Sequence, residues 1–288
     1  MSKKKALDEV TYKVFRSGNP VYLYIGLITI VFVAMALFGT TFFLAGNTGI
    51  RFIDYVRPYV AFPADWQQLP TRFYTLLTYQ FFHKDIFQAL FNCLWLFWLG
   101  KIFMDFLKPR QFHFVFLTGG VVGALFFSIA YHVFPVFSDS VYTATLLGAS
   151  ASVMAIAVAT ITLVPDYTIT LLFIGRIKLI YLVLAYIAVD LIGMASMNAA
   201  DSFAHLGGAL TGFAYIKLLR GGKDWSNWFK PKPKLKVVKN ETNTKTSKQQ
   251  KDRANQAAVD AILDKVSKSG YDKLTTAEKA ILFRASKE

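Results

Sequence analysis

Six long blocks of apolar residues lie in the first 220 residues of the chain, separated by shorter polar stretches. The blocks are residues 21–45, 86–106, 112–134, 146–164, 179–197 and 203–219. Each has about 17 to 25 residues, which is the length that a helix needs to cross the hydrocarbon core of a bilayer. The pattern therefore predicts an all-α membrane protein built from a bundle of six transmembrane helices.

The polar stretches at the start of the chain differ in character. Residues 1–20 form a short segment with several lysines, and residues 46–83 mix aromatic side chains with arginines and prolines. Aromatic residues favour the headgroup level of a membrane. The second stretch is therefore typical of a long loop lying in one membrane interface, with an ordinary extramembrane loop as the alternative.

The end of the chain predicts a separate helical segment. Residues 229–253 contain many Lys, Thr, Asn and Gln residues, which predicts a flexible linker that either rests on anionic lipid or is solvated. Apolar residues then return at helical spacing, Gly270 favours a helix end, and Thr275 with Glu278 matches a capping box. We expect a small helical hairpin.

These features predict four regions. They are an N-terminal segment at 1–20, a six-helix membrane domain at 21–220, a basic linker at 221–253 and a small helical segment at 254–288.

The distribution of charge predicts the orientation of the spans. The net charge of the chain is +14, and most of it lies beyond residue 216. Lys108 and Arg110 lie between the second and third blocks, and Arg176 and Lys178 precede the fifth, whereas the loops after the third and fifth blocks contain no Lys or Arg. The positive-inside rule then places both termini in the cytoplasm, so that the fourth and sixth spans run in the same direction.

The fourth and sixth blocks begin with small residues around a serine and a histidine. Ser150 follows Gly148, and His205 precedes Gly207, Gly208 and Gly212. Small residues let helices approach closely, and an ionisable side chain inside a membrane indicates function. Because both residues lie near the outer ends of parallel spans, we expect Ser150 and His205 to meet as nucleophile and base.

The second block carries two amides on one helix face. Gln88 and Asn92 are four residues apart, so both side chains point in one direction. They are candidate donors to the oxyanion that attack by a serine nucleophile would form, together with the backbone N–H of Ser150, or they form structural hydrogen bonds between helices.

Together these residues resemble the rhomboid intramembrane serine proteases. The resemblance rests on Gly148-Ala149-Ser150, on His205 with its following glycines, on Asn92 and on the order of the six spans, and it covers roughly residues 20–220. It implies a catalytic dyad of Ser150 and His205, and Asn92 as the oxyanion asparagine. It also implies a substrate that is a transmembrane segment of another protein.

Two positions depart from the family's pattern. Gln88 stands where the family has a second oxyanion histidine, and Ala151 stands where it has the glycine after the serine. Glutamine can donate a hydrogen bond but cannot become a cation. His83 matches a family histidine that we interpret as structural. The departures leave a non-cleaving relative, which binds or escorts transmembrane helices, as the alternative function.

The resemblance also sets expectations for the whole protein. We expect a multi-pass protein of the bacterial type in the inner (plasma) membrane, with both termini and the C-terminal helical extension in the cytoplasm. Its partners are the lipid bilayer and transmembrane substrates; no cofactor, no metal and no nucleic acid is expected. The oligomeric state stays open. A transporter or channel ranks last, since the polar residues gather on one side and no repeat is evident.

Three other polar residues need separate interpretations. Ser152 lies two residues from Ser150 and faces another direction, so we do not expect it to be the nucleophile. Asp201 either lies at the aqueous rim or orients His205 from one turn away. Asp190 lies inside the fifth block, where a carboxylate is costly, and we expect it to face the bundle interior with an unknown partner.

Overall fold

The structure is a computed structural model that describes residues 3–171, 175–193, 199–229 and 242–286. The protein is mostly helical and divides into two compact units, Met1–Lys230 and Pro231–Glu288. The first unit holds all the residues that the sequence suggests for chemistry.

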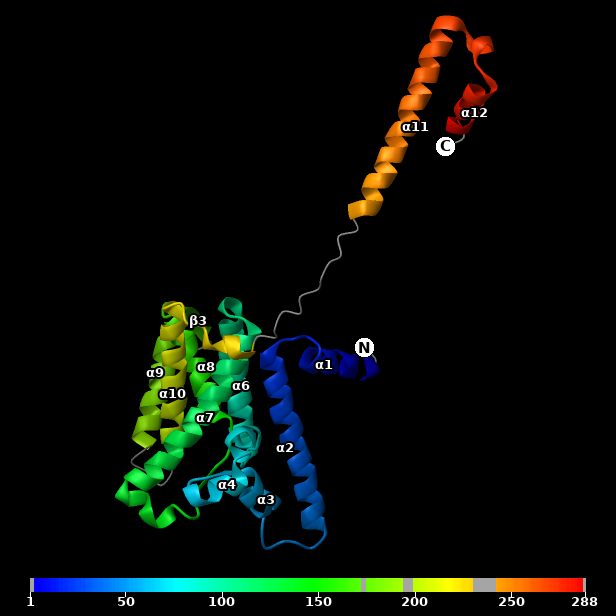
Figure 1. Cartoon of the computed structure of the whole chain (residues 1–288). Coiled ribbons are helices and arrows are strands. Elements are labelled where there is room, and N and C mark those ends of the chain that lie inside the picture. The colour runs from blue at the N-terminus through cyan, green and yellow to red at the C-terminus, as the bar shows by residue number, and fades with distance from the viewer. Residues whose placement is uncertain (1–2, 172–174, 194–198, 230–241, 287–288) are drawn as a thin grey trace. The chain divides into compact units, whose positions relative to one another are not determined.

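One helix of the first unit overlaps each of the six apolar blocks (Figure 1). After the N-terminal helix α1 (Lys3–Phe15), these helices are α2 (Pro20–Leu44), α6 (Ile86–Phe106), α7 (Pro109–Val133), α8 (Ser150–Leu163), α9 (Leu179–Gly193) and α10 (Ala199–Arg220). Among the described residues, α2, α6 and α7 are long and apolar enough to cross a membrane, and α8 and α9 are shorter apolar helices. The count of six spans stays a prediction.

Short elements fill the stretch 46–83, where the sequence predicted a loop. They are α3 (Phe52–Val60), β1 (Phe62–Pro63), η1 (Trp66–Gln68), α4 (Leu69–Arg72), α5 (Thr75–Thr78) and η2 (Tyr79–Phe81). The sequence predicted one long interfacial loop, whereas the structure forms short helical elements, because turns of helix satisfy the backbone of this aromatic segment internally. The interfacial location stays a prediction. In Figure 1, α3 and α4 lie together at one end of the bundle.

The remaining elements of the first unit are short. They are η3 (Pro135–Ser140), β2 (Thr145–Leu146), β3 (Thr168–Leu171), β4 (Gly175–Lys178) and η4 (Trp225–Phe229). Strand β2 pairs antiparallel with β1, so that Leu146 lies opposite Phe62, and β3 pairs antiparallel with β4.

Helix α8 begins later than the apolar block that contains it. The block starts at Leu146, but Leu146 belongs to β2 and the helix starts at Ser150. Gly148 has a φ of +117°, which an L side chain rarely adopts, and this turn redirects the chain from the strand into the helix. Periodicity did not reveal the boundary because Leu146, Leu147 and Ala149, which precede the helix, are apolar and buried like the helix itself.

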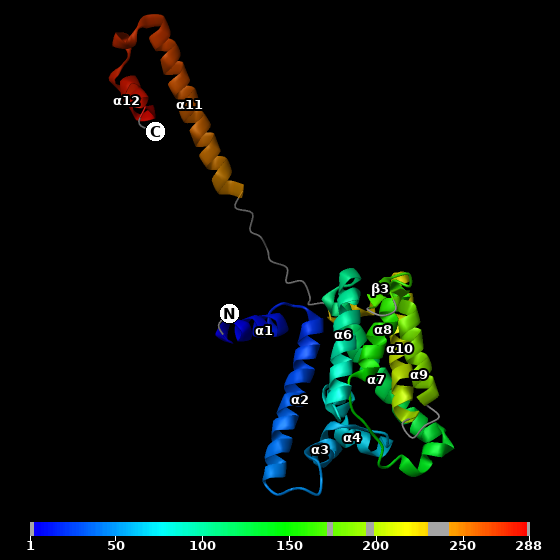
Figure 2. The ribbon, with the colours of Figure 1, turned by 180° about the vertical axis from the view of Figure 1, so that it is seen from behind.

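Helix α8 lies at the centre of the bundle. Every residue from Ala151 to Ile161 is buried, as expected for a helix that is apolar on all sides. Both views of the ribbon place it among α6, α7, α9 and α10 (Figure 1, Figure 2). The centre of the bundle therefore positions Ser150 at one end of this helix.

The second unit consists of two helices and a connecting turn. These are α11 (Thr242–Ser269), η5 (Tyr271–Lys273) and α12 (Thr276–Ala285). Gly270 has a φ of +86° after the first helix, and Thr275 and Glu278 form the capping box that the sequence indicated. Helix α11 begins at Thr242 rather than near residue 254, because the intervening Lys, Gln, Arg and Ala residues favour helix. The linker residues 230–241 lie outside the described residues.

Candidate active site

Ser150 is the first residue of α8, at the point where the buried turn ends. Its side chain is half-buried, and it makes no hydrogen bond to any residue that the structure describes. The first N–H groups of a helix have no partner within the helix and carry its positive dipole end. The position therefore offers an accessible hydroxyl beside backbone donors.

Glycines bring α10 against α8 at the level of Ser150. A Cβ atom at Gly208 would overlap the carbonyl oxygen of Ala151, and one at Gly212 would overlap that of Ala155. Ala151 directly follows Ser150, and Gly208 lies one turn after His205. The two helices therefore pack backbone to backbone, with Ser150 and His205 at the same level of the bundle.

Helix α7 closes the third side of this contact. A Cβ atom at Gly207 would lie 2.8 Å from the carbonyl oxygen of Val122. One at Gly123 would lie 2.5 Å from Cβ of Ala151 and 2.7 Å from the carbonyl oxygen of Ala204. The small residues predicted near the site thus serve helix packing, and their glycines leave no room for a side chain.

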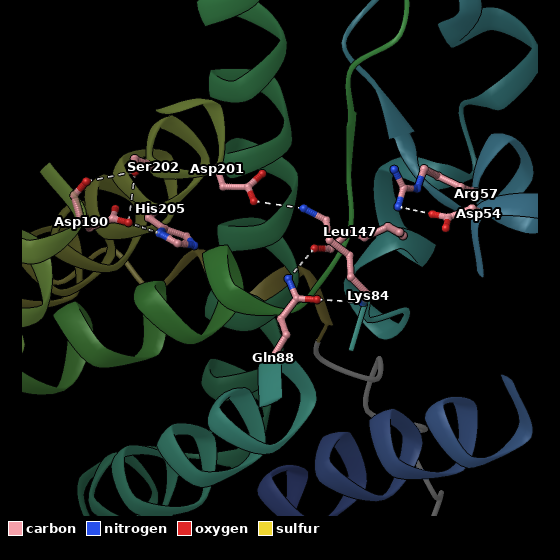
Figure 3. A network of polar contacts seen from close by, with 9 residues as sticks. All are labelled: Asp54, Arg57, Lys84, Gln88, Leu147, Asp190, Asp201, Ser202 and His205. Atoms are coloured by element: carbon pink, nitrogen blue, oxygen red, sulfur yellow. Dashed lines mark hydrogen bonds and ion pairs between the residues drawn. The ribbon is translucent and has the colours of Figure 1, made fainter. Parts of the chain in front are cut away.

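His205 is bound by a carboxylate from the neighbouring helix. Its Nδ1 lies 2.8 Å from Oδ1 of Asp190 in α9, and Oγ of Ser202, one turn before His205, donates to the same carboxylate oxygen at 3.2 Å. Figure 3 shows the three side chains converging. The partner of Asp190, unknown from the sequence, is therefore His205.

An aromatic ring of α9 also lies near His205. The ring of Tyr186, one turn before Asp190 on α9, lies 6.2 Å from that of His205 at an angle of 45°. Tyr186 in turn stacks on Trp95 of α6, with centroids 5.4 Å apart. Helix α9 thus contributes both a carboxylate and a ring to the surroundings of His205.

The structure brings Ser150 and His205 to the same level but shows no hydrogen bond between them. Within the described residues, Nε2 of His205 has no hydrogen-bond partner, since the only polar contact of the ring is through Nδ1. Catalytic hydrogen bonds are often long before substrate binds. The dyad itself therefore stays a prediction.

Gln88 holds the turn before Ser150 in place. Its Nε2 donates to the carbonyl oxygen of Leu147 at 3.1 Å, and its Oε1 accepts the backbone N–H of Lys84 at 2.9 Å (Figure 3). A Cβ atom on Gly148 would lie 2.8 Å from this amide nitrogen. One of the two amide hydrogens of Gln88 is therefore engaged with backbone, and its predicted role at the oxyanion stays a prediction.

His83, which pairs with Asn92, also contacts the turn that precedes Ser150. Nδ2 of Asn92 lies 3.0 Å from Nε2 of His83, and the N–H of Ala149 donates to the same ring nitrogen at 3.4 Å. Burial lowers the pKa of His83 to about 4, so that the ring is neutral at pH 7. His83 thus has the contacts of a structural residue, adjacent to the candidate oxyanion amide.

Two polar residues near the site have other partners. Ser152 is fully buried and donates to Oε1 of Gln80 at 2.7 Å. Asp201 forms a half-exposed ion pair with Lys84 at 3.2 Å and does not contact His205 (Figure 3). The carboxylate that contacts His205 is that of Asp190, and the sequence signal for it was an acidic residue inside an apolar block.

Comparison with known families identifies the first unit. Residues 70–222, more than half of the chain, match the family model described as the Rhomboid domain. The chain belongs to the rhomboid family, which confirms the resemblance predicted from the sequence. Residues 243–288 match a second model, described as a family of unknown function (DUF6576). No curated protein matches the chain.

Membership of this family and the apolar helices together show an integral membrane protein. Rhomboid proteins are usually intramembrane serine proteases that act on transmembrane substrates within the bilayer. In the part of the chain that the structure describes, no group of three or more His, Cys, Asp and Glu side chains could hold a metal ion.

Proposed function

We propose that the protein is an intramembrane serine protease in which Ser150 attacks a peptide bond of a transmembrane substrate and His205 is the base. The observation that carries the proposal is the contact of Gly208 with the backbone of Ala151. This contact supports a direct approach of His205 to Ser150. Among the described residues, no side chain hydrogen-bonds to Ser150, and the Nε2 atom of His205 has no hydrogen-bond partner.

The proposed reaction follows the known chemistry of serine hydrolysis. Oγ of Ser150 forms a bond to the carbonyl carbon while its proton moves to Nε2 of His205, and the carbonyl electron pair moves to the oxygen. Asn92, Gln88 and the N–H of Ser150 are the proposed donors to that oxyanion. His205 then protonates the leaving amine, and water releases the acyl group by the reverse steps.

The length of α8 supports a site below the membrane surface. A helix of 14 residues is roughly 21 Å long, shorter than the hydrocarbon core of about 30 Å. If the end of α8 lies at the cytoplasmic surface, Ser150 lies several ångströms inside the opposite leaflet. The irregular turn before it is acceptable at that depth because it is buried in protein.

The orientation and cellular location are part of the proposal. The basic loops favour cytoplasmic termini in a bacterial inner membrane, as the sequence predicted. The substrate is then a transmembrane segment that reaches Ser150 from the outer leaflet.

A fluorophosphonate probe tests the proposal, since it labels only a serine that a base activates. We expect labelling of the purified chain, loss of labelling in Ser150→Ala, and persistence in Ser152→Ala, whose serine is engaged with Gln80. Labelling that survives Ser150→Ala would contradict the proposal. No labelling of the wild type, together with stable binding of an intact helix, would favour the non-cleaving relative that Gln88 and Ala151 suggest.

A further inference from the structure

Asp190 is a carboxylate whose presence the two-residue mechanism does not explain. It lies in α9, a helix that is otherwise apolar, and a charged side chain in such a helix is costly unless it is paired. Packing of α9 against α10 alone would be achieved more cheaply by an aliphatic residue. The position therefore indicates a role that needs a carboxylate.

The geometry around Asp190 is that of a residue that orients a histidine. Its Oδ1 lies 2.8 Å from Nδ1 of His205, and the two side chains are only 13% and 12% exposed. An ionised carboxylate only accepts hydrogen bonds, so the nitrogen that faces it must carry the proton. The other nitrogen, Nε2, is then the unprotonated one and is available as a base.

We propose that Asp190 is a positioning residue that completes a Ser150–His205–Asp190 triad. It fixes the ring of His205 with the proton on Nδ1, and it stabilises the imidazolium that forms when His205 takes the proton of Ser150. The inference rests on the proposed function, because Asp190 acts only through His205.

Neighbouring residues contact both members of this pair. Ser202 donates to Oδ1 at 3.2 Å and to the backbone carbonyl of Asp190 at 3.0 Å. Tyr186 lies four residues before Asp190 on the same face of α9, and its ring centroid is 6.2 Å from that of His205. Ser202 of α10 therefore holds the carboxylate of Asp190, and Tyr186 of α9 packs near the ring of His205.

Substitution of Asp190 in the full chain tests the inference. Asp190→Asn keeps the shape and one acceptor, but its NH₂ group can donate to an unprotonated Nδ1 and so favours the wrong tautomer. In liposomes with a transmembrane substrate, we expect kcat to fall by about 100-fold or more while KM changes by less than about threefold. We expect Asp190→Glu to recover part of kcat, since it restores the carboxylate.

The matched control is Asp201→Asn. It makes the same chemical change, and its ion pair with Lys84 is half-exposed, so we expect kcat within about threefold of wild type. If Asp190 only anchors α9, the loss of kcat in Asp190→Asn will follow a lower melting temperature, and Asp190→Glu will give no rescue. Wild-type kcat in Asp190→Asn would overturn the inference.

A spectroscopic readout separates this inference from the proposed function. The chain has 4 histidines, so ¹⁵N spectra of histidine-labelled protein, compared with those of His205→Gln, resolve the tautomer of His205. We expect Nδ1–H in the wild type and a mixture in Asp190→Asn. An unchanged tautomer would refute the positioning role, even if the wild-type chain neither cleaves nor binds the probe and the proposed function has failed.

Discussion

At the residue scale, the polar side chains around Ser150 are engaged with backbone as much as with one another. Gln88 holds the carbonyl of Leu147, and His83 accepts the N–H of Ala149 while it pairs with Asn92. These contacts fix the turn that presents Ser150. The site therefore depends on a buried histidine that stays neutral, which links the stability of the turn to pH.

The pKa of His83 predicts that the protein is destabilised in acid. Its ordinary pKa of 6.5 is lowered by burial to about 4, so the unfolded chain binds this proton at a higher pH than the folded one. The contribution of His83 to the free energy of unfolding is then at its maximum above about pH 6.5. It falls as the pH is lowered toward 4, by at most about 3 kcal/mol. Thermal unfolding in detergent between pH 7.5 and 4.5 measures the slope.

The matched variant is His83→Gln, which keeps an acceptor but cannot take up a proton. We expect its melting temperature to be lower at pH 7.5 and to change less between pH 6.5 and 4.5 than that of the wild type. Equal slopes in the two proteins would show that His83 is not the group responsible.

The sequence indicated candidate residues for the site more readily than their pairings. Ser150 and His205 stood out because each is polar among small residues at the start of an apolar block. The link between Asp190 and His205 depends on how α9 and α10 pack, and that information is not carried by spacing within either helix. Asp201, one turn from His205, was the local alternative, but the structure pairs it with Lys84.

At the scale of elements, the close contact of α8 and α10 determines the site. Gly208 and Gly212 allow two helix backbones to touch, and Gly148 provides the turn into α8. The helices inside the apolar blocks could be predicted because length and composition suffice for them. The late start of α8 at Ser150 could not, since the pairing of Leu146 with Phe62 joins distant segments.

Substitution of a contact glycine should separate these helices. In Gly208→Ala the new methyl group would overlap the carbonyl oxygen of Ala151, and we expect a loss of about 1–3 kcal/mol in the free energy of unfolding. Because the methyl group also moves His205 away from Ser150, probe labelling should fall as well. Thermal unfolding and fluorophosphonate labelling of the same samples measure both effects.

Gly39→Ala is the control at this scale. Gly39 lies in α2, and a Cβ atom there meets only Cβ of Phe52, at an ordinary distance of 3.5 Å. Alanine is favoured over glycine in helices by about 1 kcal/mol, so we expect unchanged or slightly raised stability and unchanged labelling. Equal destabilisation by the two substitutions would contradict the packing that we describe.

At the scale of the whole molecule, the exposed surface of the first unit fits a lipid environment. Large apolar side chains such as Leu37, Phe38, Leu90 and Ile192 are exposed on α2, α6 and α9. Extensive apolar surface of this kind is unfavourable in contact with water. The central helix α8 is instead covered by protein. The proposed hydrolytic site at its end would then be reached by substrates that share the bilayer.

The second unit and the positive charge of the C-terminal region were also evident from the sequence, but their function was not. The capping box at Thr275 and the turn at Gly270 predicted a hairpin of helices. The start of α11 at Thr242 was missed because composition alone does not distinguish a polar linker from a polar helix.

The most direct test of the central claim is cleavage of a transmembrane substrate by the purified chain in liposomes. We expect wild-type protein to cut a helix-destabilised transmembrane segment, and Ser150→Ala and His205→Ala each to reduce the rate to background. Cleavage at the wild-type rate by both variants would contradict it.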